Sequence, residues 1–196
     1  MPLGAFKAGL MGASGAAAAG DVVLLSSQTA SNSASLSFTS GIDSTYGEYI
    51  FGFYNINPAT DAAFLTVQFN ATDSTSYDET ITSISWNSQH GAGGTAQLDI
   101  NTDAYNQGQE TEYQRLTREI GNGAAEMGAG VMHLFNPSST TYVKHFLSRI
   151  QMYQQGDNSM DIFVGGYVNT TTAIDDAQFK MSSGNFDGKI KMWGVK

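Results

Sequence analysis

The last eighteen residues of the chain follow the two-residue repeat of a half-buried β-strand. Phe179 and Met181 alternate with polar residues, and after a polar turn Ile190 and Met192 alternate with lysines to the end of the sequence. Because successive side chains of a strand point to opposite sides, this repeat indicates a sheet with one buried and one solvated face. We therefore predict a final β-hairpin in a protein built around the interior of a sheet sandwich or barrel.

Short strands of the same kind recur along the rest of the sequence. Gly, Asn, Asp and Pro separate them, and no strand–helix–strand rhythm is present. This pattern predicts one domain over residues 21–196, an all-β antiparallel β-sandwich of the jelly-roll kind. One segment, Glu110–Ile120, also fits a short helix ended by Gly121. Before the last strand, the predicted strands are 22–25, 34–38, 49–56, 65–69, 81–86, 96–100, 113–116, 131–135, 143–153, 160–168 and 173–181.

Composition makes several classes of function improbable. The chain has 18 acidic and 9 basic residues, and its net charge of -9 disfavours nucleic acid and anionic membranes as partners. It has no cysteine, which excludes disulfides, thiolate metal sites and a cysteine nucleophile. No apolar run approaches the roughly 18 to 20 residues of a membrane-spanning helix. We expect a soluble protein with no nucleic-acid and no membrane partner.

Residues 1–20 differ from the rest because they consist largely of Gly and Ala. Gly4, Gly9, Gly12 and Gly15 interrupt its middle, which argues against a secretion signal. Its larger apolar side chains are too few to fold alone, so the segment is interpreted as an extended N-terminal arm. We predict that it docks on a neighbouring chain, the alternative being an arm that lies on its own domain. The predicted contact residues are Leu3, Phe6, Leu10 and Met11.

One stretch has partial calcium-loop spacing. Asp99, Asn101, Asp103 and Glu110 occupy positions 1, 3, 5 and 12 of such a loop, and calcium prefers oxygen ligands of this kind. Ala104 replaces the glycine that permits the sharp turn, and the first two residues also fit the wet side of a strand. The pattern favours an ordinary surface, with calcium as the one cofactor considered.

No arrangement of residues typical of catalysis is present. The three histidines, His90, His133 and His145, are far apart in sequence, and no motif orients them. We expect His145 to be a partly buried sheet residue. The paired carboxylates Asp175 and Asp176 lie in a predicted turn, where aspartate is common for conformational reasons. We therefore predict that the protein is not an enzyme.

Several Ser-, Thr- and Asn-rich segments with embedded aromatic residues form a distinctive set. They are Leu25–Phe51, Asn55–Asp61 (NINPATD), Phe135–Tyr142 (FNPSSTTY), Gly165–Thr171 (GGYVNTT) and Phe179–Lys196. Together they resemble a family of virion structural proteins from tailed phages of marine bacteria and cyanobacteria. The resemblance implies a concanavalin-A-like jelly roll on the particle exterior, either as head decoration or as part of a tail fibre.

The chain has no long repetitive stalk of the kind a fibre needs, which favours head decoration. The expected function is that of a capsid decoration (cement) protein that stabilises the head by bridging capsid subunits. Its expected partners are the major capsid protein or other virion proteins, and its own copies in a trimer or dimer. The alternative is a tail-fibre or other surface module that binds a receptor or host glycan, with Tyr46, Tyr77 or Tyr105 as stacking platforms.

Overall fold

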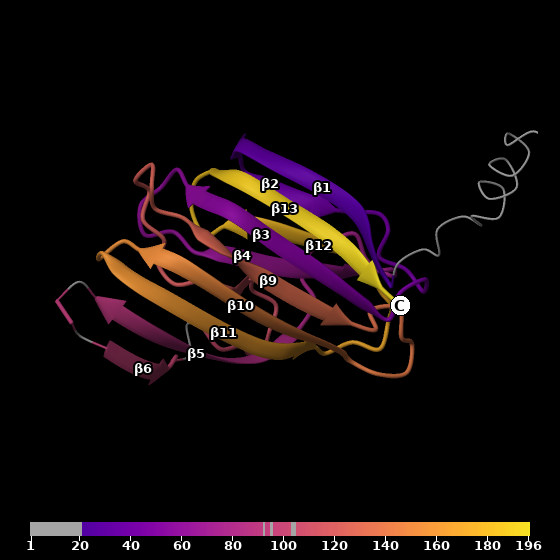
Figure 1. Cartoon of the computed structure of the whole chain (residues 1–196). Coiled ribbons are helices and arrows are strands. Elements are labelled where there is room, and N and C mark those ends of the chain that lie inside the picture. The colour runs from indigo at the N-terminus through magenta and orange to yellow at the C-terminus, as the bar shows by residue number, and fades with distance from the viewer. Residues whose placement is uncertain (1–20, 92, 95, 103–104) are drawn as a thin grey trace, which may run out of the picture.

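Two antiparallel sheets pack face to face in the computed structural model, which describes residues 21–91, 93–94, 96–102 and 105–196. Figure 1 shows the larger sheet toward the viewer, with the smaller sheet behind it. The fold is therefore the all-β antiparallel sandwich that the sequence predicts. The described part of the chain contains no helix, and hence none that could cross a membrane. The predicted arm, with Leu3, Phe6, Leu10 and Met11, lies outside the described residues.

The nine-stranded sheet, called the large sheet below, runs in the order β1-β13-β3-β9-β10-β11-β5-β6, with β7 also paired to β5. Eight of these strands were predicted from the alternation, although β1 is three times as long as expected because its polar second half continues the pairing with β13. The strands are β1 Val22–Ser33, β3 Glu48–Pro58, β5 Ile81–Gly91, β6 Ala96–Ile100, β7 Gly108–Glu110, β9 Gly128–Phe135, β10 Lys144–Gln154, β11 Asn158–Val168 and β13 Phe186–Val195.

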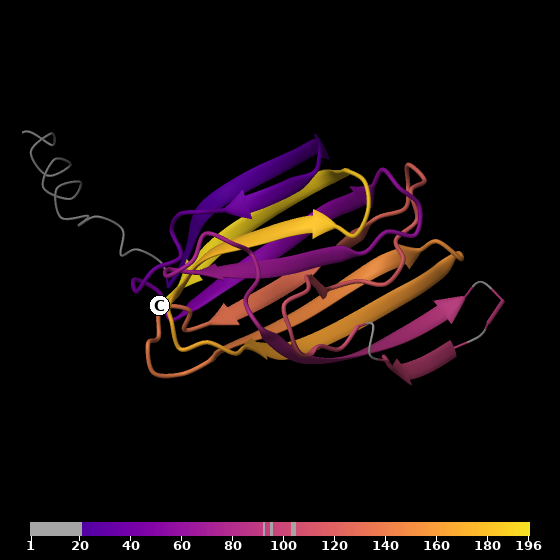
Figure 2. The same cartoon turned by 180° about the vertical axis from the view of Figure 1, so that it is seen from behind.

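The four-stranded sheet, called the small sheet below, has the order β2-β12-β4-β8. Figure 2 shows it from behind, lying across the inner side of the large sheet. Its strands are β2 Ser35–Phe38, β4 Leu65–Ala71, β8 Gln114–Arg115 and β12 Ile174–Met181. Every residue of β4 is buried, so both faces of this strand are covered. Other parts of the chain therefore cover the outward face of β4, whereas the outward residues of β2 and β12 are only half-buried.

Aromatic side chains from both sheets fill the space between them. Phe179 of β12 lies at the centre of this cluster, with its ring centroid 6.0 Å from Phe38, 5.2 Å from Phe51 and 5.3 Å from Phe53. All four side chains are at most 2 % exposed. Edge-to-face packing of this kind adds to the gain from apolar burial. The cluster fixes the small sheet on the large one.

The predicted final hairpin is wrong, although both of its strands exist. β12 pairs with β2 and β4 in the small sheet, whereas β13 pairs with β1 and β3 in the large sheet. The turn between them, which contains Gly184 at a φ of 68°, carries the chain from one sheet to the other. Phe179 therefore points into the core from the small sheet, and Ile190 points into the core from the large sheet. Alternation specifies which face of a strand is buried, but it does not specify the strand's partner.

The short helix considered for Glu110–Ile120 does not form. Gly108–Glu110 instead makes β7 at the edge of β5, and Gln114–Arg115 makes β8 beside β4. Gln114 is completely buried, and its amide group donates hydrogen bonds to the carbonyls of Tyr105 and Arg115 at 2.9 and 2.8 Å. Tertiary hydrogen bonds therefore override the helical spacing of the apolar residues in this segment.

Candidate functional site

The four residues of the calcium pattern do not converge in the described part of the structure. Asp99 pairs with Asn87 and Glu110 with Ile81, six positions apart along β5, which places the Cα atoms of the two acidic residues about 20 Å apart. Asn101 is 5 % exposed, and its Oδ1 accepts a hydrogen bond from Arg118 at 3.0 Å. Asp103 lies outside the described residues. Among the described residues, no group of three or more acidic or histidine side chains could hold a metal ion.

We expect calcium to leave the thermal stability unchanged. A guanidinium group already occupies the Asn101 oxygen, and one ion cannot reach both Asp99 and Glu110. A melting curve with and without millimolar calcium measures this, because an ion that binds only the folded state raises the melting temperature. A rise of several degrees would restore the calcium site, and magnesium serves as the control for a general effect of divalent salt.

The three histidines considered for catalysis are separated in the fold, and the carboxylate pair Asp175 and Asp176 lies in strand β12, not in the predicted turn. His133 of β9 is half-buried and pairs with Glu48. His145 is exposed, contrary to the expectation of partial burial, because the inward positions of β10 belong to Lys144, Phe146 and Ser148. His90 lies exposed near the far end of β5. The three rings therefore stay on different strands, as their distance in sequence suggested.

The loop tyrosines predicted as glycan platforms are partly covered. Tyr46 packs edge-on against Tyr49 at 5.9 Å, and Tyr77 is half-buried. Tyr105 is only 8 % exposed, with two guanidinium groups against its ring. A sugar ring needs an open aromatic face on which to stack. Neighbouring groups cover these tyrosines, so they are poorly placed to stack against a sugar ring on the surface.

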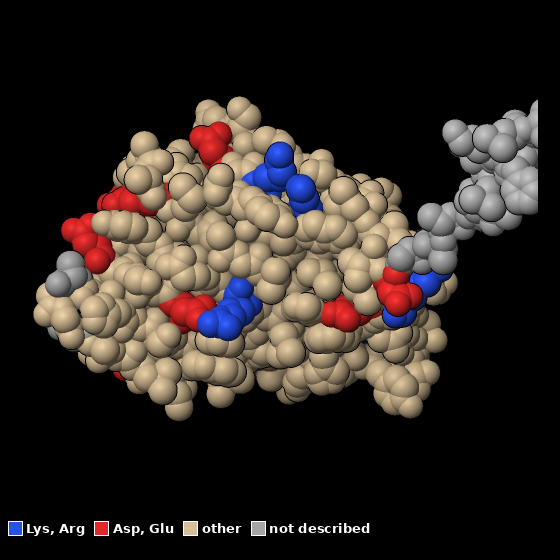
Figure 3. Space-filling view, in the orientation of Figure 1, with Lys and Arg blue, Asp and Glu red and all other residues tan. Residues whose placement is uncertain are grey.

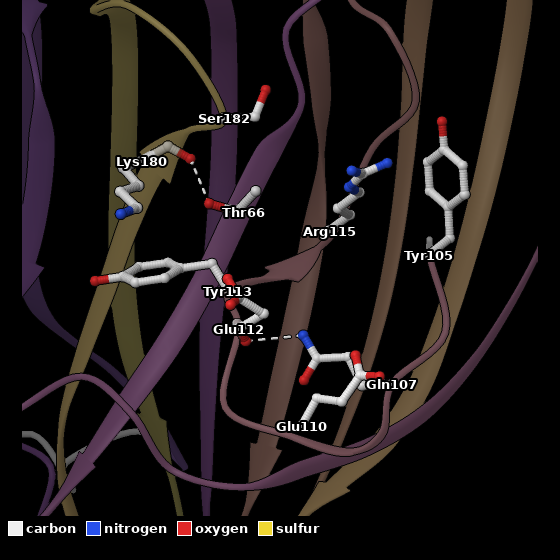
Figure 4. A pocket seen from close by; sticks show the side chains of 9 residues that line it. All are labelled: Thr66, Tyr105, Gln107, Glu110, Glu112, Tyr113, Arg115, Lys180 and Ser182. Atoms are coloured by element: carbon white, nitrogen blue, oxygen red, sulfur yellow. Dashed lines mark hydrogen bonds between the residues drawn. The ribbon is translucent and has the colours of Figure 1, made fainter. Parts of the chain in front are cut away.

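A cleft of about 460 Å³ opens on the outward side of the small sheet. Figure 4 shows Lys180 and Arg115 on either side of Thr66, with Gln107 and Glu110 at the other end of the cleft. This arrangement follows from the sheet register, since Lys180 of β12 and Arg115 of β8 both pair with Thr66 of β4. The remaining lining residues are Tyr105, Glu112, Tyr113 and Ser182.

Buried glutamines hold the wall of this cleft in place. The amide group of Gln68 donates hydrogen bonds to the carbonyls of Glu79, Thr111 and Glu112 at 3.0, 2.9 and 3.1 Å. The amide group of Gln107 donates to the carbonyl of Glu112 at 2.8 Å, and its own buried oxygen accepts no hydrogen bond in the described structure. Buried polar networks of this kind restrict a segment to one conformation. The cleft wall is therefore preorganised.

Each of the two cationic side chains of the cleft packs over an aromatic ring. The Lys180 Nζ lies 3.7 Å from the ring centroid of Tyr113, and the Arg115 guanidinium lies 4.3 Å from Phe64 and 4.9 Å from Tyr105. Among the described residues, neither cation belongs to an ion pair. Burial raises the pKa of Tyr105 and of Tyr113, so both hydroxyls stay protonated at neutral pH.

A second candidate surface is the outer face of the large sheet, the side turned away from the small sheet. Of the eleven large apolar residues exposed in the described structure, all except Tyr142 lie on this outer face by their strand register. They are Val22, Leu24, Tyr54, Ile84, Trp86, Leu98, Ile100, Val131, Leu147 and Tyr153. Such a concentration of apolar surface marks an interaction site in many proteins.

Few charges interrupt the outer face. Figure 3 looks onto it and shows mostly uncharged surface, with one adjacent acidic and basic pair near the centre. Arg149 and Asp161 form such a pair by a two-pronged contact, with nitrogen–oxygen distances of 2.9 and 2.7 Å to Oδ2. Glu48 is paired with His133, and β13 adds Asp187 and its lysines, whereas Lys144 of β10 is buried and points inward. The acidic excess of the chain therefore lies elsewhere.

The aromatic rings on the outer face are stacked against their neighbours. Trp86 and Phe163 lie parallel, 5.2 Å apart with a 5° angle, and the Arg149 guanidinium lies 4.8 Å from the Phe163 centroid. The register places Phe163 between the other two, so both faces of its ring are covered. Beside this stack is an apolar depression of about 390 Å³, lined in part by Val131, Leu147 and Gly165. The surface suits a protein partner better than a stacked sugar.

Sequence reasoning missed both surfaces for identifiable reasons. The cleft joins Lys180, Thr66 and Arg115, which are distant in sequence and meet only through strand pairing. The outer face carried a weak signal, because β5 and β10 place apolar residues such as Ile84 and Leu147 at positions that alternation assigns to solvent. A large apolar residue at a strand position that alternation assigns to solvent is the sequence signal that indicates such a surface.

Comparison with known proteins gives no family. No family model matches the chain, and no curated protein matches it. Among solved structures it is similar to a non-specific endo-β-1,3(4)-glucanase from family GH16, with 10 % identity and a TM-score of 0.23 over 83 % of this chain and 63 % of the other. It is also similar to the structure of infectious bursal disease virus, Gx strain, with 10 % identity and a TM-score of 0.19 over 89 % and 40 %.

The chain thus spans less than two thirds of the length of either structure. At these TM-scores neither likeness carries an argument about fold or activity. The sandwich architecture follows from the strand pairing of this chain itself, and its function has to be argued from its own surfaces.

Proposed function

We propose that this chain is a structural protein of the virion exterior, a capsid decoration protein that stabilises the head by bridging capsid subunits. The observation that carries the proposal is the outer face of the large sheet, where ten large apolar side chains are exposed and charged groups are few. The sequence resemblance to virion structural proteins of tailed phages supports the same assignment. A cement function needs adhesive surface and no reaction.

The outer face is large enough for such a contact. Its six central strands, β13, β3, β9, β10, β11 and β5, span about 29 Å at the usual strand spacing. β10 and β11 are paired over eleven residues, which corresponds to about 36 Å. The product is on the order of 1,000 Å², close to the roughly 800 Å² that each partner buries in a standard protein interface. A protein that binds the assembled shell, and not the free capsid subunits, stabilises the shell by mass action.

A charge on the outer face should weaken particle binding. We expect Leu147→Glu to weaken binding of the full chain to heads that lack it by at least about tenfold, because burying an unpaired carboxylate is unfavourable. The measurement is cosedimentation over a range of protein concentrations. Tyr142→Glu is the matched control, since Tyr142 is 69 % exposed but lies off this face.

Equal binding of the Leu147→Glu and Tyr142→Glu proteins would remove the outer face from the proposal. Unchanged melting temperatures of both variants establish that neither loss of binding arises from unfolding. No binding of the unaltered chain to such heads would contradict the decoration function as a whole.

The alternative location is a tail fibre or another receptor-binding part of the particle. Cryo-electron microscopy of the intact particle distinguishes the two by copy number, because a decoration protein repeats over the whole shell. We expect many copies, grouped as trimers or dimers, with the outer face of the large sheet directed toward the shell. A few copies confined to the tail would favour the alternative.

A further inference from the structure

The cleft on the small sheet has the features of a ligand site that the decoration function does not use. Its two cations lie on strands that flank β4, so their Cα atoms are about 10 Å apart, one on each side of Thr66. Long side chains from both sides can reach one small anionic group between them. Since neither cation forms an ion pair among the described residues, their charges remain available to a ligand.

The opposite end of the cleft has a different chemistry. Glu110 is exposed there, and Gln107 lies beside it with an oxygen that accepts no hydrogen bond in the described structure. Glu112, also exposed, lies next to Tyr113, between this end and Thr66 (Figure 4). Carboxylates accept hydrogen bonds from hydroxyl groups, but they repel a second anionic group. This end therefore favours a neutral part of a ligand that is rich in hydroxyls, and it disfavours a polyphosphate or nucleic-acid strand.

We propose that the cleft binds an acidic saccharide, a sugar that carries one carboxylate. Arg115 and Lys180 hold the carboxylate, while Glu110 and Glu112 accept hydrogen bonds from ring hydroxyls. The volume of about 460 Å³ falls within the range of small-molecule sites. The amide network of Gln68 and Gln107 keeps the wall in place before binding, which reduces the entropy lost when the ligand binds.

Isothermal titration of the full chain tests this site. The probes are glucuronate and N-acetylneuraminate, with glucose as the sugar without a carboxylate and acetate as the carboxylate without a sugar. We expect at least one acidic sugar to bind at about millimolar strength or better, and glucose and acetate to bind at least about tenfold more weakly. No acidic sugar binding at about 10 mM would overturn the proposal, and so would acetate binding as tightly as the best acidic sugar.

Charge-removing variants locate the site. We expect Lys180→Gln to weaken acidic-sugar binding at least about tenfold, since a hydrogen bond to a charged group is lost. Lys191→Gln is the matched control, because Lys191 also lies over a tyrosine, 5.4 Å from the ring of Tyr54, but on the other sheet. Arg115→Gln should have the same effect as Lys180→Gln, and a melting curve shows whether losing the contacts of Arg115 with Phe64 and Tyr105 also unfolds the chain.

Unchanged affinity of the Lys180→Gln protein would refute the assignment even if Arg115→Gln fails to fold. The inference is independent of the decoration function. If the chain binds acidic sugars but not heads, the cleft proposal stands and the decoration function is refuted. If it binds heads but not acidic sugars, the decoration function stands and the cleft proposal is refuted.

Discussion

Replacement of Phe179 by alanine is expected to lower the free energy of unfolding by about 3–5 kcal/mol. The ring is completely buried and packs against Phe38, Phe51 and Phe53, which come from both sheets. Its removal leaves a cavity at the point where the sheets meet, and the surrounding strands cannot close it without losing their pairing. Urea unfolding followed by far-ultraviolet circular dichroism measures the change.

The control for this experiment is Leu98→Ala. Leu98 is 76 % exposed, so its truncation should change the free energy of unfolding by less than about 0.5 kcal/mol. A loss below about 1 kcal/mol for Phe179→Ala would contradict the packing of the two sheets through this cluster.

The second large effect is expected from Gly130→Ala in β9. A Cβ atom at this position would lie 2.6 Å from the Ile150 Cα atom and would also collide with the Arg149 carbonyl oxygen. Both are backbone atoms of the neighbouring strand, so they can move only by breaking the ladder between β9 and β10. We expect a loss of about 3 kcal/mol or more in the free energy of unfolding, by the same urea measurement.

Gly165→Ala is the matched control on the nearby strand β11. A Cβ atom there would meet only the end of the Leu147 side chain, at 3.3 Å, and that side chain can rotate away. Its stability should therefore stay within about 0.5 kcal/mol of the original, or rise slightly because alanine loses less backbone entropy than glycine on folding. Similar losses of stability for Gly130→Ala and Gly165→Ala would contradict the prediction that the Cβ atom at position 130 collides with the backbone of β10.

The two candidate surfaces lie on opposite sides of the sandwich. Leu147 points outward from the large sheet, whereas Thr66 and Lys180 point outward from the small sheet. If the large sheet docks on a shell as proposed, the cleft faces away from that shell and stays accessible to solutes. Both proposed activities are therefore compatible in one molecule, and the variants that test them are at different sites.

Much of the architecture could be predicted from local pattern. The alternation in segments such as Lys144–Gln154 fixed strand type and inward face, because a strand's side chains have a period of two. Strand pairing could not be predicted in the same way. A short polar turn joins the last two strands, which predicts a hairpin, but that turn crosses between the sheets.

Some buried polar residues were also beyond local pattern. Lys144 has no exposed surface, and its Nζ donates a hydrogen bond to the Thr170 carbonyl at 3.1 Å. Burial lowers the pKa of this lysine, while the nearby Glu79 carboxylate opposes the shift. A lysine among strand residues normally indicates solvent, and only the loop that closes over it supplies the hydrogen-bond acceptor.

The sequence by itself determined an acidic, cysteine-free, all-β chain with amphipathic strands, because composition and a two-residue repeat are local properties. The tertiary structure alone decided which strands are neighbours, and neighbours create both candidate sites. Lys180, Thr66 and Arg115 become a cleft, and Arg149, Phe163 and Trp86 become a stacked surface, only through the register of strands that are distant in sequence. Register is set by the packing of the whole core, which no single segment encodes.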